Sequence, residues 1–524
     1  MNQVAVLRKQ IQYYSYVLGA IILLMFGRMI GNNGVAYLAI AMETVGLFMV
    51  LLGDDTAEVF GKMLRFRRKR KQYNDALVVK KRIMILQFSL GLVCFGAVFL
   101  LADVIAIKLF QIPNTALIIR ILAPVLFLRM MSTLLIGYFQ GSGAQMPAVF
   151  SSVLRQILFL ILGKLFCGGF LEYGEKVSAL LKNDDFYGMY GAVGLALAIV
   201  LSEVVILIAM VIFYFISDRN YDKKRCESGL HKAERLQDTL QGFYGLGAAG
   251  IGFSFLKRIF VLVALILLVS LEEIGLYYGK YLLLCAIPVL FVVARYYILY
   301  ARMISAMKNK NGRQVREKIQ IGLQYAWCAG ILMVVLMAVL APQIVNAYFP
   351  EDAVLLNMLQ GGSLLILAVI LLAYLVVVHS AHKRKLASLL TLAGAAVFSM
   401  VLAVLLGGKM ESQLMAVIYA GVISLYLAVM ILGAITISQY HLKLEYVQVF
   451  ILPLVCVGVV GVIVLLMSKL LAPHIGNGLT CWLGIVLGVV LYLVALGFCR
   501  VFSENEIEQL YGNVGKRILS VIFK

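Results

Sequence analysis

Long apolar stretches alternate with short polar gaps along the whole chain. Each stretch has about 18 to 28 residues, and about 20 apolar residues let a helix cross the hydrocarbon core of a bilayer. Because strands are much shorter than this, the pattern predicts membrane-spanning helices. Fourteen such helices are predicted, at residues 13–30, 35–53, 84–107, 115–138, 148–170, 190–217, 243–270, 276–301, 319–345, 354–378, 386–406, 414–437, 447–468 and 481–502.

The polar gaps between these helices are too short to fold by themselves. The longest have about 20 residues each, at 65–81, 172–189, 218–241 and 503–524, and none of them can bury a core. With 63% hydrophobic and only 14% charged residues, the chain has too little polar surface for a soluble protein of this size. We therefore predict an all-α polytopic membrane protein, with an amphipathic helix within 503–524 that lies on the inner membrane surface.

Lys and Arg residues concentrate in every second gap, most of all in 62–82. Short cytoplasmic loops of membrane proteins carry such an excess. With the N-terminus inside, and with Arg500 at the end of the last span counted in the tail, the cytoplasmic gaps hold 32 Lys and Arg residues and the outer gaps hold five. This predicts that both termini are cytoplasmic. The net charge of +20 then belongs to loops beside the membrane, where it attracts anionic lipid, and it does not indicate nucleic-acid binding.

The order of spans and basic gaps repeats weakly after six spans. An even-numbered repeat gives both halves the same orientation, as in the parallel repeats of several transporters. The chain is therefore predicted to have an N-terminal six-helix bundle in 1–238 and a C-terminal six-helix bundle in 239–445. Two extra helices and the amphipathic tail would occupy 446–524.

Apart from Arg500 at the end of the last span, nine Lys and Arg residues lie inside the predicted spans. An ionisable group within a bilayer is costly and normally faces a partner or a water-filled cavity, so each is a functional candidate. The basic excess favours an anionic ligand, because guanidinium groups bind phosphate through two parallel hydrogen bonds. Arg28, near a span end, can also reach the interface. The candidates for binding a diphosphate in a cavity are Arg28, Arg129, Arg155, Lys257, Arg258 and Arg295.

Two carboxylates inside the spans, Glu43 and Glu203, leave a second interpretation open. Either one can pair with an arginine of the same bundle, which would make those arginines structural. Either one can also carry a proton or help to coordinate Na⁺, and so couple transport to an ion gradient. No other cofactor and no metal site are expected, since the cysteines and histidines lack metal-ligand spacing. No catalytic constellation is found, so an enzyme is not expected.

Three segments carry a resemblance to a known family. They are FGRMIGNNGVAYLAIAMETVGLF (26–48), LLIGYFQGSGAQMPAVFSSVLRQIL (134–158) and YGAVGLALAIVLSEVV (190–205). The chain resembles the polysaccharide transporter and stage V sporulation protein B-like branch of the multidrug/oligosaccharidyl-lipid/polysaccharide (MOP) flippase superfamily. In the second segment the matching residues are Gly137, Tyr138, Phe139, Gln140, Gly141, Pro147, Arg155 and Gln156.

The resemblance implies two six-helix bundles around a central cavity, with alternating access. It also implies a cargo, a polyprenyl-diphosphate-linked oligosaccharide that crosses a bacterial plasma membrane. Family members hold the diphosphate with basic residues of the first, second and eighth spans. The nearest residues here are Arg28 and Arg295, and the second span offers only Glu43.

The sequence therefore favours a flippase for a cell-envelope or exopolysaccharide precursor. One alternative is a non-catalytic subunit of a polysaccharide synthesis or export assembly, in which glycosyltransferase or export subunits would be partners. Another is a cation-coupled exporter of small molecules on the same fold. A cavity for cations would be acidic and aromatic, and the basic excess inside the spans argues against it.

Overall fold

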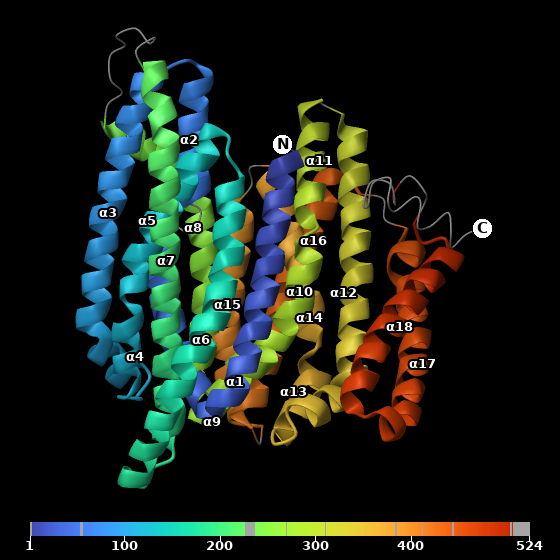
Figure 1. Cartoon of the computed structure of the whole chain (residues 1–524). Coiled ribbons are helices and arrows are strands. Elements are labelled where there is room, and N and C mark those ends of the chain that lie inside the picture. The colour runs from blue at the N-terminus through green and yellow to red at the C-terminus, as the bar shows by residue number, and fades with distance from the viewer. Residues whose placement is uncertain are drawn as a thin grey trace. The chain divides into compact units, whose positions relative to one another are not determined.

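The computed structural model describes residues 3–52, 56–225, 236–268, 270–309, 311–382, 385–410, 412–442, 445–502 and 506. Within these ranges all regular structure is helical, which confirms the predicted all-α fold (Figure 1). Thirteen helical segments are long and apolar enough to cross a membrane. The predicted amphipathic tail lies outside the described residues, apart from Glu506.

The first of these segments, Val6–Val50, contains two of the predicted spans. Its 45 residues would reach about 68 Å at 1.5 Å per residue, about twice the thickness of a hydrocarbon core. Gly31 breaks the helix between the two, at φ 71° and ψ 174°, a region of backbone conformation that is essentially restricted to glycine. Counting the two halves of this segment separately, each of the 14 predicted spans has a helical counterpart.

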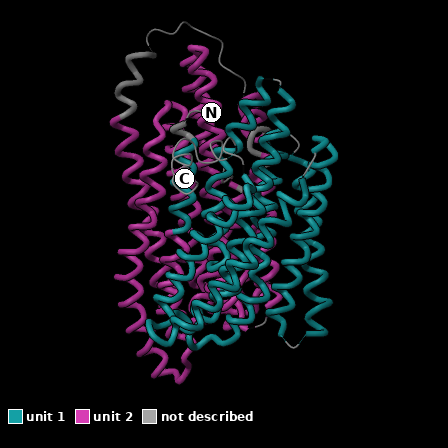
Figure 2. Tube along the Cα trace, turned by 90° about the vertical axis from the view of Figure 1, so that its right-hand side faces the viewer, with its two compact units in different colours: residues 1–17, 281–524 teal, residues 18–280 magenta. Residues whose placement is uncertain are grey.

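Contacts divide the chain into two compact units, residues 18–280 and residues 1–17 with 281–524. Figure 2 colours them magenta and teal. The boundary at residue 280 follows the seventh predicted span, whereas the predicted bundle boundary at residue 238 precedes it. The division into two bundles of six helices and two extra helices stays a prediction.

The unit of residues 18–280 holds most of the predicted site residues. Pro124 begins one of its helices, and Gly143, at φ 98°, ends the same helix in a left-handed cap, as is common at helix C-termini. The elements of this unit are α1 (Gln3–Leu52, from residue 18), α2 (Thr56–Lys69), α3 (Tyr73–Val104), η1 (Ile105–Leu109), α4 (Thr115–Leu122), α5 (Pro124–Ser142), α6 (Met146–Leu181), α7 (Asp185–Arg225), α8 (Leu236–Leu267), α9 (Leu271–Leu276) and the start of η2 (Tyr277–Leu282).

Buried tyrosines join the helices of the other unit through its backbone. The hydroxyl of Tyr296 donates to the carbonyl oxygen of Ile370 at 3.0 Å, and that of Tyr374 donates to Ile319 at 2.9 Å. These bonds satisfy the polar groups of buried side chains. The elements are the first 15 described residues of α1, the end of η2, α10 (Leu283–Val293), α11 (Tyr296–Lys308), α12 (Gly312–Tyr348), α13 (Ala353–Gly362), α14 (Leu364–Ala381), α15 (Lys385–Gly407), α16 (Gln413–Tyr440), η3 (Val447–Ile451), α17 (Leu452–Ile475) and α18 (Asn477–Phe498).

Large apolar side chains are exposed along many of the spans. Examples are Leu100 on α3, Leu165 on α6, Val404 on α15, Leu466 on α17 and Trp482 on α18. A soluble protein rarely exposes apolar surface on this scale, whereas lipid tails cover it without cost. The chain is therefore a multi-pass membrane protein.

Candidate functional site

The two carboxylates that the sequence singled out are buried within the spans of the unit 18–280. Glu203 on α7 is 1% exposed and Glu43 on α1 is 4% exposed. A buried charge is tolerated only when it is paired and hydrogen-bonded. Each of the two has an arginine partner from another helix. For Glu203 the partner lies in the same predicted bundle, as the sequence left open, whereas the partner of Glu43 lies in the other predicted bundle.

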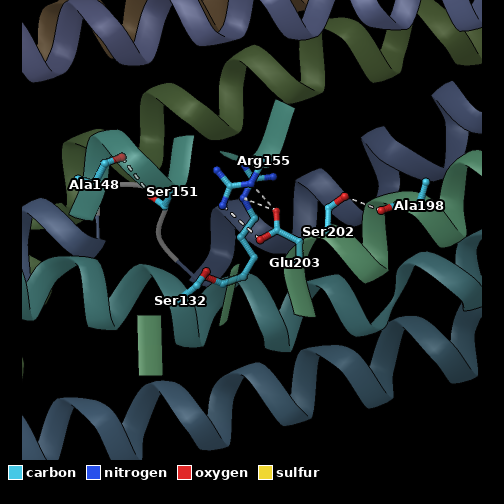
Figure 3. A network of polar contacts seen from close by, with 8 residues as sticks. Ser132, Ala148, Ser151, Arg155, Ala198, Ser202 and Glu203 are labelled. Carbon is cyan, nitrogen blue, oxygen red and sulfur yellow. Dashed lines mark hydrogen bonds and ion pairs between the residues drawn. The ribbon is translucent and has the colours of Figure 1, made fainter. Parts of the chain in front are cut away.

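Glu203 is held by the guanidinium of Arg155 on α6. The Nε atom of Arg155 donates to Oε1 of Glu203 at 2.6 Å, and its Nη2 atom donates to Oε2 at 3.2 Å. Both carboxylate oxygens are therefore engaged, in the two-bond geometry that makes arginine–carboxylate pairs specific. Figure 3 shows Arg155 and Glu203 facing each other between helices.

A second guanidinium completes this cluster. The Nε atom of Arg129 on α5 lies 4.0 Å from Oε1 of Glu203. The side chains of Arg129, Arg155 and Glu203 are 40%, 18% and 2% exposed. With two guanidinium groups and one carboxylate, the cluster carries a net charge of +1, and its most exposed member is a cation. It can therefore present a guanidinium to an anion.

The serine hydroxyls around the cluster are satisfied by their own helices. Ser132 donates to the carbonyl of Arg129, and Ser202 donates to the carbonyl of Ala198 (Figure 3). Such bonds to a preceding turn are the usual solution for serine inside a helix. These two hydroxyls are therefore engaged within their own helices, and the charge of the cluster comes from its two guanidinium groups and one carboxylate.

Glu43 is the centre of a second cluster. Its Oε1 atom accepts a bond from Nη1 of Arg258 on α8 and another from the hydroxyl of Tyr278 in η2, both at 2.8 Å. Its Oε2 atom is buried and has no hydrogen-bond partner among the described residues. A Cβ atom on Gly46, one turn along α1, would lie 2.6 Å from Cζ of Arg258. A side chain at this position would therefore require the guanidinium to shift.

The remaining predicted cations are Arg28, Lys257 and Arg295. Arg28 on α1 and Lys257 on α8 are exposed. Arg295 is half-buried just before α11, in the unit that does not contain Arg28. The structure thus joins three of the six predicted cations to buried carboxylates, in two clusters.

Sequence reasoning missed two members of the second cluster, Tyr278 and Gly46. The tyrosine is one of 27 and carried no distinguishing signal. The glycine did carry a signal. It follows an intramembrane acid by three positions and so lies on the same helix face, where the lack of a side chain leaves space for a partner. No group of three metal-binding side chains is present in the described part of the chain.

The chain is similar to a known protein family. The family model described as "Polysaccharide biosynthesis protein" matches residues 9–300. No curated protein matches the chain.

Among solved structures, the chain is similar to an inward-facing multidrug resistance MATE family transporter of the MOP superfamily. That match has a TM-score of 0.64 and 15% identity, and it covers 82% of this chain and 95% of the other. A MOP superfamily transporter from Pyrococcus furiosus matches with a TM-score of 0.57 and 14% identity, over 84% and 95% of the two chains. These structures establish a shared fold, and together with the family match they confirm the resemblance to the MOP superfamily. Since the family model matches more than half of its length, the chain belongs to the polysaccharide biosynthesis protein family.

Proposed function

We propose that the protein moves a polyprenyl-diphosphate-linked oligosaccharide across the bacterial plasma membrane by alternating access. The observation that carries this proposal is the net positive cluster of Arg129, Arg155 and Glu203 within the spans. Membership of a polysaccharide biosynthesis family and the fold of MOP transporters support it.

The chemistry of the cargo matches this cluster. A lipid diphosphate has an apolar tail that stays in the bilayer and an anionic head that needs a compensating charge. Arg129 has the exposure to meet the diphosphate, and its fork of donors fits phosphate oxygens. Glu203 holds Arg155 at its side and keeps both guanidinium groups close together despite their mutual repulsion. The carboxylate therefore positions the cations, and no step of this function needs a catalytic residue.

The basic segments at the ends of the spans have a separate part in the proposal. The last turn of α2 contains Arg67, Arg68 and Lys69, and Arg65 on the same helix donates to the carbonyl of Gln140 at 2.7 Å. We place this segment and both chain termini on the cytoplasmic side, where anionic lipids attract juxtamembrane cations.

An exporter of small cations is the second candidate, because the solved structures of this fold include multidrug transporters. The pocket of the transporter from Pyrococcus furiosus is described as having reversed polarity that suggests a different function. In this chain the buried carboxylates of Glu43 and Glu203 have arginine partners, which offset the charge that would attract a cation. The observations therefore favour an anionic cargo.

The direct test is movement of the cargo in vesicles. The purified chain is reconstituted with a fluorescent polyprenyl-diphosphate oligosaccharide, and access of a membrane-impermeant quencher reports transfer between leaflets. We expect transfer well above protein-free vesicles, and a loss of at least tenfold in Arg129→Gln. Arg120→Gln is the matched control, because Arg120 forms an exposed pair with Asp103. The absence of transfer by folded wild-type protein would overturn the proposal, and undiminished transfer by Arg129→Gln would remove the cluster from it.

A further inference from the structure

A cavity of about 470 Å³ lies at one end of the unit that comprises residues 1–17 and 281–524. Its lining comes from the last turns of α11, α14 and α16, from the residues that follow α14 and α16, and from the start of α12. Small-molecule sites in proteins have volumes of about 300–1,000 Å³, so this cavity is large enough for a ligand. The clusters around Glu43 and Glu203 do not contribute to it, because both lie in the other unit.

The polar groups that line this cavity are suited to an anion. Arg316 contributes a guanidinium, His382 and His441 contribute imidazoles, and Asn311 and Gln439 contribute amides. None of the described residues in the lining is acidic. A guanidinium presents a planar fork of donors that fits two phosphate oxygens. Because the other polar groups come from different helices, they suit the tetrahedral oxygens of a phosphate better than the two coplanar oxygens of a carboxylate.

Three of these side chains have polar atoms that the chain itself leaves available. Arg316 forms no hydrogen bond or ion pair with the residues that the structure describes. The Nδ1 atom of His382 lies 2.9 Å from the carbonyl oxygen of Val378. Since a carbonyl only accepts, this nitrogen donates, and Nε2 stays available. The side-chain oxygen of Asn311 accepts from the backbone N–H of Gln314 at 3.1 Å, which leaves the amide nitrogen of Asn311 for a ligand.

The six-span repeat predicted from the sequence offers a comparison within the chain. In the first copy, Arg65 comes from the basic gap after the second span. It donates to the carbonyl oxygen of Gln140, in the turn after the fourth span, at 2.7 Å. In the second copy, Arg316 comes from the basic gap after the eighth span and lines the cavity together with His382, in the turn after the tenth span. The first guanidinium bonds to its own chain, whereas the second borders a cavity and is left for a ligand.

We propose that this cavity binds an organic phosphate, with the guanidinium of Arg316 as the principal contact. The whole described lining lies in gaps that the charge pattern predicts to be cytoplasmic. These gaps are 302–318, 379–385 and 438–446, and they hold six, three and one Lys or Arg residues. Such a positive surface raises the local concentration of anions. The phosphate belongs either to the headgroup of an anionic lipid or to a soluble metabolite, and in both cases it connects α12, α14 and α16.

Isothermal titration calorimetry of the purified full-length chain in a non-ionic detergent measures this binding. Glycerol 3-phosphate represents a soluble phosphate, and dihexanoyl phosphatidic acid carries the same phosphate on a short-chain lipid. We expect wild-type protein to bind at least one of them. Arg316→Gln should bind it more weakly by about tenfold or more, because the charge-assisted hydrogen bonds to the phosphate are lost.

Arg313→Gln is the matched control. It removes the same charge from an exposed position on the same helix, outside the lining of the cavity. Its affinity should stay within about twofold of wild type, since exposed charges act only weakly at a distance. Arg129→Gln should bind the probes as wild type does, because Arg129 lies in the other unit.

The two probes identify the source of the phosphate. Binding of the lipid that is tighter by about tenfold or more assigns the cavity to a headgroup, and equal affinities assign it to a soluble phosphate. Either result supports the inference.

Three results would overturn the inference. The first is a folded wild-type protein that binds neither probe. The second is an equal loss in Arg316→Gln and Arg313→Gln, which would indicate general attraction to a basic surface. The third is equal affinity for glycerate, a carboxylate of similar size, which would exclude selection of phosphate. Each of these leaves the flippase proposal standing, because transfer between leaflets is measured separately.

Discussion

Replacing Arg155 by methionine tests how the cluster around Glu203 is held together. The change removes the guanidinium that bonds to both oxygens of a carboxylate that is 1% exposed. The change leaves helix α6 in place and puts an apolar side chain of similar length at this position. What it loses is the charge that permits Glu203 to be buried in ionised form.

The magnitude follows from what remains near Glu203. Removing one partner of a buried ion pair costs about 3–5 kcal/mol. Arg129 stays 4.0 Å from Oε1, where an opposite charge contributes about 4 kcal/mol at an effective dielectric of about 20. Water reduces this contribution, because Arg129 is 40% exposed. We therefore expect the lower end of the range, about 3 kcal/mol, which is more than a hundredfold in the unfolding equilibrium.

A double-mutant cycle, measured by denaturant unfolding in detergent, isolates the interaction free energy between Arg155 and Glu203. The variants are Arg155→Met, Glu203→Gln and both together, and the double variant should recover most of the stability that Arg155→Met loses. Arg120→Met is the control, because its pair with Asp103 is exposed, and it should cost less than about 1 kcal/mol. A double variant less stable than Arg155→Met, with no coupling between the two changes, would refute the reasoning.

Three further changes test local geometry. Gly31→Ala should destabilise the protein by about 1–3 kcal/mol, because alanine is strained at φ 71°. Thermal unfolding checks this, with Gly96→Ala as the control because its site has open space. Gly46→Ala should lower the free energy of unfolding by about 1–3 kcal/mol in the same comparison, because its Cβ would lie 2.6 Å from Cζ of Arg258. A loss no greater than that of the control would contradict this packing. Cys456 and Cys499, with sulfur atoms 3.5 Å apart, should form an intramolecular disulfide under mild oxidant, and peptide mapping that finds both thiols free would count against this placement of the last two helices.

The positions of the spans could be predicted from sequence because a bilayer imposes a local rule. The thickness of the hydrocarbon core sets the length of each apolar stretch, and no knowledge of neighbouring helices is needed to apply it. The break between the first two spans was predicted for the same reason. Its form was not predicted, because Gly31 ends one helix and begins the next without a separate loop.

The candidate residues also came from the sequence, since a charge within a span is unusual wherever it points. Their partners did not. Glu203 and Arg155 are 48 positions apart, and Glu43 and Arg258 are 215 apart. Nothing in either span specifies which face of a helix meets which neighbour, because that depends on how the helices pack and rotate against one another. The sequence alone determined that charges lie within the spans of this protein, and the tertiary structure decided which of them are buried and which of them neutralise each other.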